Sequence, residues 1–224
     1  MSLPATLSER EVLTAVRGVL DPELDESIVD LGFLTRVDVH GDEVRLELRL
    51  PTYWCAPNFS WLMAEDLRQA ALGVPGVRQA TVHLLDHHAG NEISAGVNSG
   101  RSFAETFGED ATAETLGPLR QLFRRKAFLA RQVRLLATLP RERLDGLRIG
   151  DLPDTAHAQA YLAVRAELGL DCTPAAPVIT DAAGREATDI DAHIRAARLV
   201  RVSTDGNTAL CRGVFQTRYP RGSG

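Results

Sequence analysis

The chain has 224 residues, of which 44% are hydrophobic and 25% are charged, and its formal net charge is −5. These values are typical of an ordinary soluble protein with one large domain or two small ones. No apolar run approaches the ~18 residues of a membrane-spanning helix, and Met1–Pro4 lacks the basic and apolar regions of a signal peptide.

The number of cysteines and the distribution of charge further restrict the class of protein that the chain can belong to. Three cysteines, an odd number at wide spacing, argue against a disulfide framework and for a reducing compartment, so we expect a cytoplasmic protein. Residues 1–108 contain 16 acidic and 8 basic residues, whereas residues 109–224 contain 14 acidic and 17 basic ones. This shift indicates two modules, and neither is basic enough to predict nucleic-acid binding. Glycine-rich phosphate loops are absent, which argues against a nucleotide-dependent enzyme.

The first expected element is a helix over residues 9–20. Ser8 and Glu11 have the spacing of a capping box, in which the serine hydroxyl and the glutamate carboxylate bond free backbone amides. Apolar residues then recur at helical spacing. Asp21-Pro22 ends the helix, because the residue before a proline is disfavoured in the helical conformation.

A hairpin is expected next. Residues 34–40 and 43–50 flank Gly41-Asp42, whose composition is typical of a turn, and the second strand alternates apolar and charged residues. This alternation predicts an antiparallel strand with one buried face. The residues expected on the buried face are Val44, Leu46, Leu48 and Leu50.

A second helix and a third strand complete the first module. Asn58 is a candidate helix cap, Gly73–Gly76 ends the helix, and residues 77–85 return as a strand. The order helix, hairpin, helix, strand predicts an α+β fold, a small sandwich whose mixed three-stranded sheet has helices on one face. The stripe expected to be buried on the second helix is Phe59, Leu62, Met63, Leu67, Ala70 and Ala71.

The rest of the chain predicts a helix-rich α+β module. Residues 86–112, rich in Gly, Ser, Asn and Asp, are typical of a loop or linker. A long helix over 116–139, with Leu119, Leu122 and Phe123 inward and arginines on the other face, and a shorter helix over 155–168 should follow. The tail 198–215, with Asp205-Gly206-Asn207 at its centre, is typical of a second hairpin. The expected parts are therefore a domain at 1–88, a linker at 89–112 and a C-terminal extension at 113–224.

Cys55 is the leading candidate for chemistry. It stands in Pro51-Thr52-Tyr53-Trp54-Cys55-Ala56-Pro57, at the expected start of a helix. Free amides and the helix dipole stabilise a thiolate there, which makes it a good ligand or nucleophile. A small buried hydrophobic residue is an equally good interpretation. No histidine stands in a recognisable nucleophile–base motif with it.

Asp86, His87 and His88, directly after the third strand, are the second candidate site. Adjacent histidines on a loop can coordinate zinc or iron, with Asp86 as a ligand or as an orienting group. Ordinary solvated loop residues are the alternative. Neither a Cys-x-x-Cys pair nor a His-Glu-x-x-His motif is present, so a closed structural zinc site is not predicted.

Asp21, Glu23 and Asp30 form an acidic group upstream of Cys55. Capping of local backbone amides is the simpler role for Asp21 and Asp30. Cys172 and Cys211 have no motif around them, and we expect both to be packing residues.

Four segments follow one another in a characteristic order: Asp21-Pro22-Glu23, Ile28-Val29-Asp30-Leu31-Gly32, Pro51-Thr52-Tyr53 and Val74-Pro75-Gly76-Val77. Together they resemble the iron–sulfur cluster assembly domain of SufT and PaaD over about residues 8–86. The resemblance implies an accessory maturation factor that helps to deliver clusters or metal to client enzymes without turnover chemistry of its own. It implies that the family's cysteine corresponds to Cys55 and its acidic motif to Asp21, Pro22 and Glu23. Pro-Thr-Tyr before the cysteine is most similar to PaaD, which implies a multicomponent oxygenase as the client.

Three hypotheses follow. In the first, Cys55 holds an iron–sulfur cluster or iron transiently for a client metalloenzyme, with Glu23, His87 or His88 completing the site. One cysteine cannot fill the coordination of a cluster, so a homodimer or a client cysteine would supply further ligands. In the second, the protein is a metal-independent assembly chaperone that grips a monooxygenase subunit through its second half. In the third, Cys55 is the nucleophile of an enzyme and needs a base within hydrogen-bond reach.

Overall fold

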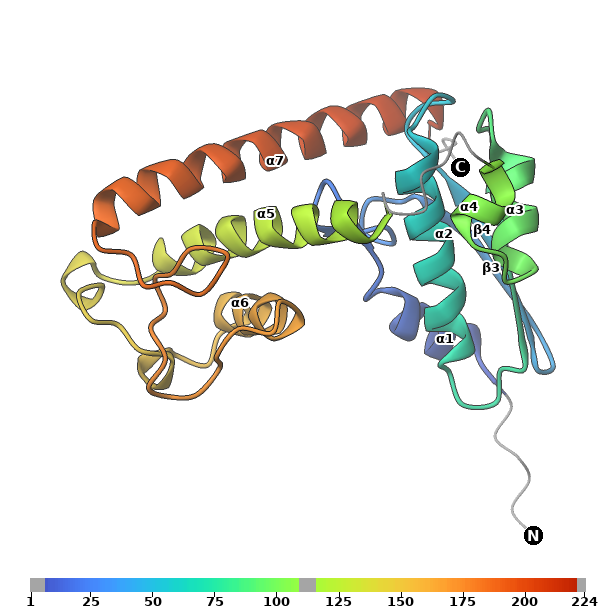
Figure 1. Cartoon of the computed structure of the whole chain (residues 1–224). Helices are drawn as coiled ribbons and strands as arrows, with labels where there is room; N and C mark the ends of the chain where they lie inside the picture. Colours follow the sequence, from blue (N-terminus) through green and yellow to red (C-terminus); the bar gives the residue numbers. More distant parts are fainter. Residues whose placement is uncertain (1–6, 109–115, 221–224) are drawn as a thin grey trace, which may run out of the picture. The chain divides into compact units, whose positions relative to one another are not determined.

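The computed structural model describes residues 7–108 and 116–220. Contacts between Cα atoms divide the chain into two units: unit 1 contains residues 1–116 and 208–224, and unit 2 contains residues 117–207. Figure 1 shows the course of the chain from one end to the other. The expected boundary at 89–112 differs from this grouping, because the C-terminal residues from 208 onward contact the N-terminal unit.

Unit 1 is built on a three-stranded sheet of β3 (Leu34–His40), β4 (Glu43–Arg49) and β5 (Gln79–Leu85). The strand order is β3-β4-β5, with β3 and β4 antiparallel and β4 and β5 parallel. The predicted α+β class and the mixed three-stranded sheet are therefore confirmed. Two short strands, β1 (Leu20–Asp21) and β2 (Glu26–Ser27), form a separate antiparallel pair.

The alternation in β4 and β5 has the expected effect on burial. Every second side chain lies in the core, and the residues between them are partly or fully exposed. Because successive side chains of a strand point to opposite faces, the apolar sets of both strands share one face. Helices α2 and α3 pack against β5 (Figure 1). The buried strand residues are Val44, Leu46, Leu48, Ala80, Val82 and Leu84.

The helices of unit 1 begin close to the predicted positions but differ at their ends. α1 (Glu9–Val16) has the predicted capping box, although it ends at Val16 rather than at residue 20, because Leu20 pairs with β2. α2 (Pro57–Leu72) begins with Pro57 in its first turn, and its N-cap is Ala56. Asn58 is therefore not the cap. Proline suits this position because the first amides of a helix have no intrahelical partner.

The prediction of a loop over residues 86–112 is wrong for the part that the structure describes, and residues 109–112 lie outside the described residues. The described part contains α3 (Gly90–Asn98) and α4 (Phe103–Phe107). Asn98 of α3 covers the open edge of β5: its Oδ1 accepts a hydrogen bond from the Val82 amide, and its Nδ2 donates one to the Val82 carbonyl, both at 2.8 Å. The amide side chain thus replaces a neighbouring strand, which protects an otherwise unpaired sheet edge.

Unit 2 is helical. It contains most of α5 (Leu116–Leu136), all of α6 (Ala156–Glu167), two short 3₁₀ turns at 141–143 and 149–151, and the first part of α7 (Ile190–Arg218). The two predicted helices and the helix-rich character of the region are confirmed. Within residues 117–207, all of which the structure describes, only two isolated β-bridges occur, so this unit has no sheet.

The predicted C-terminal hairpin is wrong, because α7 runs unbroken from Ile190 to Arg218. A two-residue hairpin turn needs positive φ angles, and Gly206 does not adopt one. Asp205, beside it, instead forms an ion pair with Arg134 of α5 at 2.7 Å. A tertiary contact therefore overrides the turn composition of this segment.

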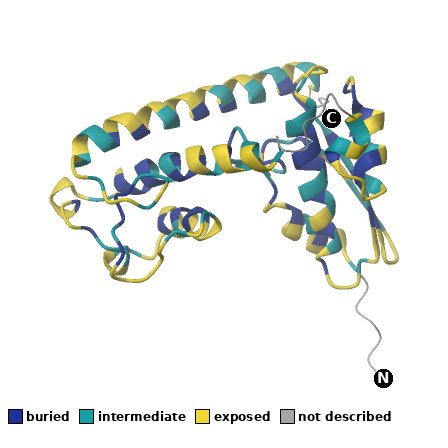
Figure 2. Ribbon diagram, viewed as in Figure 1, coloured by how far each residue is buried: buried dark blue, intermediate teal, exposed yellow. Residues whose placement is uncertain are grey.

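The two faces of α5 differ largely as expected, and Figure 2 shows buried and exposed residues alternating along the helix. Phe123 and Phe128 are buried. Leu122 was expected to face inward, but it is 49% exposed, so this prediction is wrong. The arginine face makes contacts of its own, including an ion pair of Arg124 with Glu167. In the described part of the chain, none of the helices combines the length and the apolar character that crossing a membrane requires.

Candidate functional site

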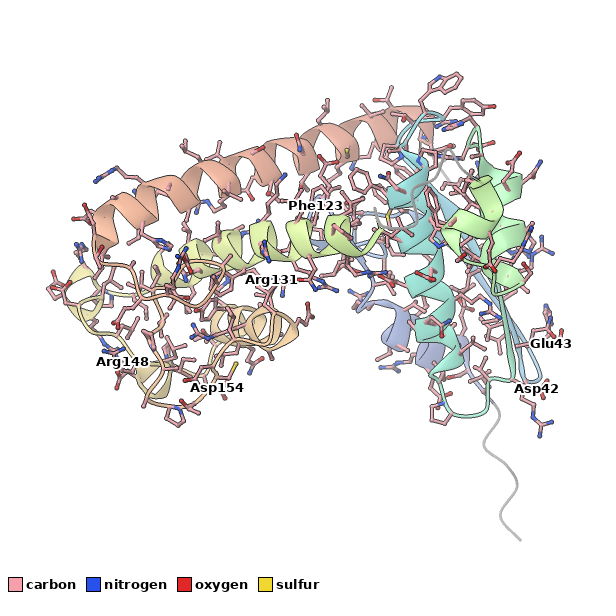
Figure 3. All side chains as sticks on the ribbon, viewed as in Figure 1. Asp42, Glu43, Phe123, Arg131, Arg148 and Asp154 are labelled. Atoms are coloured by element: carbon pink, nitrogen blue, oxygen red, sulfur yellow. The ribbon has the colours of Figure 1, made fainter. Side chains whose placement is uncertain are left out.

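The predicted site residues of unit 1 gather around one end of the sheet. The parallel strands β4 and β5 are in register from Glu43 and Gln79 to Arg49 and Leu85. Both strands therefore end at the same edge, and the segments that follow them carry Cys55 and the Asp86–His88 group. The β3–β4 turn, where Asp42 is labelled in Figure 3, lies at the opposite end of β4.

Cys55 lies one residue before the N-cap of α2, slightly outside the first turn in which it was expected. Its side chain is half-buried and packs partly against the core. The Thr52 hydroxyl lies 3.3 Å from the Cys55 Sγ. Within the described residues no imidazole or carboxylate hydrogen-bonds this sulfur. The thiol is thus neither sealed in the core nor paired with a base.

His87 holds the backbone of Cys55 in place. Its Nδ1 accepts a hydrogen bond from the Ala89 amide at 3.1 Å, so the ring proton is assigned to Nε2. Nε2 donates to the Cys55 carbonyl at 2.8 Å and lies 3.1 Å from the Ser60 hydroxyl. Burial lowers the pKa of His87, which favours the neutral ring that this network requires. Both ring nitrogens are therefore engaged, and the role of His87 here is to position Cys55.

His88 and Asp86 point to other partners. The exposed His88 ring stacks on Trp54, with 5.3 Å between ring centroids, and Asp86 forms an ion pair with Arg49 at 2.8 Å. In the part of the chain that the structure describes, no three His, Cys, Asp or Glu side chains form a group able to hold a metal ion. Metal binding by Asp86, His87 and His88 stays a prediction, and this geometry does not favour it.

Asp21 is the most strongly perturbed acid of the site. Its side chain is 9% exposed, and its Oδ1 accepts hydrogen bonds from the amides of Glu23 at 2.9 Å and Leu24 at 3.0 Å. It therefore caps the turn that follows it. The pKa of Asp21 is raised to about 6, chiefly by burial, with the opposing effect of the Leu24 and Glu23 amide hydrogen bonds and the smaller raising effect of the Glu23 charge included. Asp30 lies apart, in a surface ion pair with Arg17.

Cys211, which the sequence pattern indicated as a packing residue, belongs to the same neighbourhood. It is half-buried in the last third of α7, in the part of that helix that belongs to unit 1. The pKa of its thiol is raised to about 11, chiefly by burial and in addition by the charges of Asp21, Cys55 and Glu23. Cys211 and Cys55 both pack against the core of unit 1.

The end of α7 is attached to unit 1 by contacts on either side of Cys211. Arg212 forms an ion pair with Glu26 of β2. The Phe215 ring packs on Phe33, with 5.1 Å between centroids. Just after the helix, the Tyr219 hydroxyl donates to Asp86 Oδ2 at 3.2 Å. Cys211, Phe215 and Tyr219 recur every four residues, a signal that is readable only if the segment is taken as a helix.

Comparison with known proteins places the first part of the chain in a family. Residues 9–84 match the family model described as "Iron-sulfur cluster assembly protein". A 71-residue stretch, 32% of this chain, is 35% identical to the "Iron-sulfur cluster carrier protein" of Deinococcus radiodurans. The match covers 20% of that relative, so the chain spans about a fifth of its length. The resemblance seen in the sequence is thereby confirmed: residues 9–84 form a domain of the iron–sulfur cluster assembly family.

Proposed function

We propose that this protein carries an iron–sulfur cluster or iron on Cys55 and delivers it to a client metalloenzyme. The observation that supports this best is the setting of Cys55: a half-buried thiol in a domain of the cluster assembly family, with its backbone fixed by His87. Asp21 and Glu23 belong to the same matched domain, and carboxylates suit a cationic cargo.

Delivery by this site needs only an exchange of ligands. When the cargo binds, the Cys55 thiol loses its proton and forms an iron–sulfur bond. When the cargo leaves, a deprotonated thiolate of the client takes its place on iron, the bond to Cys55 breaks, and the Cys55 sulfur regains a proton from water. Iron is neither oxidised nor reduced. The described residues provide no group of three ligands able to hold a metal ion, so in this proposal a second copy of the chain or the client supplies further ligands.

The loop that carries Cys55 also presents a surface for the client. Trp54 is 75% exposed and Tyr53 44% exposed, and their rings contact each other at 4.9 Å between centroids. Exposed tryptophan and tyrosine side chains are common anchors of protein interfaces. We therefore place the contact with the client at this loop. The oxygenase that the resemblance implies is the client in this proposal.

The arrangement around Cys55 argues against the enzyme alternative. A cysteine nucleophile needs a base within about 3.2 Å of the sulfur. Nε2 of His87, on the adjacent loop, is directed to the carbonyl oxygen of Cys55 and not to its sulfur. A non-catalytic carrier needs no such base, and the geometry therefore favours it over a hydrolase or a transferase.

The test is anaerobic reconstitution of the full chain with ferrous iron and sulfide, followed by desalting and measurement of bound iron, sulfide and the cluster's visible absorption. Wild type and Cys172→Ser are expected to retain cargo, and Cys55→Ser to lose most of it. Cys172 is a suitable control because it is exposed and lies in unit 2. Equal retention by Cys55→Ser and wild type, or no retention by either, refutes the carrier function and favours the metal-independent chaperone.

A further inference from the structure

We propose that unit 2 contains a binding site for a small anionic amphiphile, a molecule with an apolar body and one carboxylate or phosphate head group. The site is a cavity of about 500 Å³, lined by the end of α5, the turns that follow it and the first turns of α7 (Figure 1). All of the lining residues belong to unit 2 and lie outside the matched family domain. The proposal is therefore independent of Cys55 and of the cargo.

The buried part of the lining is apolar. Val133 and Leu136 come from α5, Leu144 from the turn after it and Ile194 from α7, and each of these side chains is at most 9% exposed. Leu136, Leu144 and Ile194 also belong to the hydrophobic core of unit 2. Because side chains of a packed core are held by their neighbours, this part of the cavity is formed before a ligand enters. A preformed cavity of this size with a mainly apolar lining is the usual form of a small-molecule site.

The exposed part of the lining is positively charged. Arg195 and Arg198 lie on the face of α7 that also carries Ile194, since positions three and four apart share a helical face. Neither arginine forms an ion pair with a residue that the structure describes. The carboxylate of the lining, Asp191, is engaged by Arg141 at 2.9 Å. Two guanidinium charges without a counterion therefore border the apolar cavity.

The two parts of the lining together define the chemistry of the ligand. Guanidinium groups bind carboxylates and phosphates through paired N–H donors, and an apolar body gains free energy by leaving water for the buried part of the cavity. An inorganic anion leaves the apolar lining uncovered, and a neutral apolar molecule leaves both arginines unpaired. An acidic peptide is the alternative occupant, but a protein partner normally covers a much wider surface than one cavity of this volume offers.

The test is isothermal titration calorimetry of the full chain with octanoate, octyl phosphate and the neutral 1-octanol. We expect octanoate or octyl phosphate to bind at least about tenfold more tightly than 1-octanol, because only the anions form charge-assisted hydrogen bonds. The tighter of the two anions identifies the head group. Lengthening its alkyl chain should raise the affinity by up to about fourfold per methylene, as burial of each added group predicts.

Three results of this titration would overturn the proposal. Failure of both anions to bind is the first, and equal affinity for 1-octanol and the anions is the second. The third is binding of a short glutamate–leucine peptide by a chain that binds neither anion, which would assign the cavity to a protein partner. None of these results bears on whether Cys55 carries the cargo.

Matched variants locate the binding. The double substitution Arg195→Gln and Arg198→Gln should weaken binding of the tighter anion by at least about tenfold, whereas Arg125→Gln, at an exposed arginine outside the cavity, should not. Ala137→Phe should fill the cavity and abolish binding, whereas Ala196→Phe should not, because Ala137 lines the cavity and Ala196 does not. All five positions are exposed, so the variants should fold, which far-UV circular dichroism checks. If the double variant or Ala137→Phe is folded and binds as tightly as its control, the proposal is wrong.

Discussion

The carboxylate of Asp21 should lower the stability of the metal-free protein at neutral pH, and replacing it by the neutral amide should restore that stability. Asp21→Asn keeps the shape of the side chain and its Oδ1, which accepts hydrogen bonds from the Glu23 and Leu24 amides. The substitution therefore removes the buried charge and preserves the turn. We expect Asp21→Asn to be more stable than wild type above neutral pH.

The size of the stability difference between Asp21→Asn and wild type follows from the pKa of Asp21. Burial, the largest cause, raises the pKa of Asp21 from 3.8 to about 6 in the folded protein, and a difference of this size corresponds to about 3 kcal/mol. The folded state binds this proton more tightly than the unfolded state, so stability is present at low pH and is lost as the pH rises from 3.8 through about 6. Roughly 2 kcal/mol of the loss should fall between about pH 4 and pH 7.5. Asp21→Asn has no such proton and should not show this loss.

The assay is urea unfolding of the metal-free chain at several pH values, followed by tryptophan fluorescence. The chain has two tryptophans, Trp54 and Trp61, and both belong to unit 1. The signal therefore follows the unit that contains Asp21. Asp25→Asn, in the same loop and at a positive φ that asparagine tolerates, controls for the loss of one negative charge.

Two results would refute this reasoning. If Asp21→Asn is less stable than wild type at neutral pH, the carboxylate is stabilised by its amide partners more than it is penalised by burial. If the difference between the two proteins does not depend on pH, Asp21 titrates alike in the folded and unfolded states. The expected result would show that the chain keeps a destabilising charge at this position, which is common for residues selected for function rather than for stability.

Three further substitutions test the fold. Asn98→Ala should cost about 1–3 kcal/mol, because it leaves the amide and carbonyl of Val82 unpaired; unchanged urea unfolding and unchanged hydrogen exchange at Val82 would contradict this role. Gly96→Ala should cost about 1–3 kcal/mol by overpacking, since its Cβ would lie 2.6 Å from the Trp61 ring, and a neutral effect on unfolding would disprove that contact. Gly206→Ala should instead stabilise α7 by about 1 kcal/mol, because its Cβ meets open space; slower hydrogen exchange in the helix would confirm this, and a loss of helix by circular dichroism would favour a turn.

The sheet and α2 were predictable because their signals are local. In β4 an apolar residue stands at every second position, from Val44 to Leu50, and only one face of a strand can then be buried. The start of α2 was placed within one or two residues, although Pro57 and not Asn58 marks it. For these elements the sequence pattern and the tertiary packing require the same conformation.

α3 was missed because its glycines have a packing role. A Cβ on Gly90 would lie 2.5 Å from the Leu84 carbonyl oxygen, so this residue is required for close approach of the helix to β5. The glycine content that is typical of a loop thus reflects contact with the sheet. One local signal was available: Ser102 and Glu105 form a capping box at the start of α4. A capping box within a segment taken as a linker is evidence for a helix.

The site was predictable only for the residues that the family motif contains. Cys55 and Asp21 stand in the recognised segments, whereas Cys211 lies in a segment whose Asp-Gly-Asn sequence is typical of a turn. No local pattern links Cys211 to residues so far away in the sequence. The packing of Phe215 on Phe33 and the ion pair of Arg212 with Glu26 place it, and such long-range contacts cannot be derived from periodicity alone.

The residues of unit 1 come from the two ends of the chain. Unit 1 contains residues 1–116 and 208–224, so the chain leaves this unit, folds unit 2 and then returns to it. The matched domain by itself contains Cys55, but it does not contain Cys211. Cys211 joins unit 1 through the last part of α7, and the ion pair of Arg212 with Glu26 holds that part of the helix on the unit. Because that ion pair is partly exposed, it contributes less than about 1 kcal/mol to stability; its role in this arrangement is to set the position of the cysteine next to it.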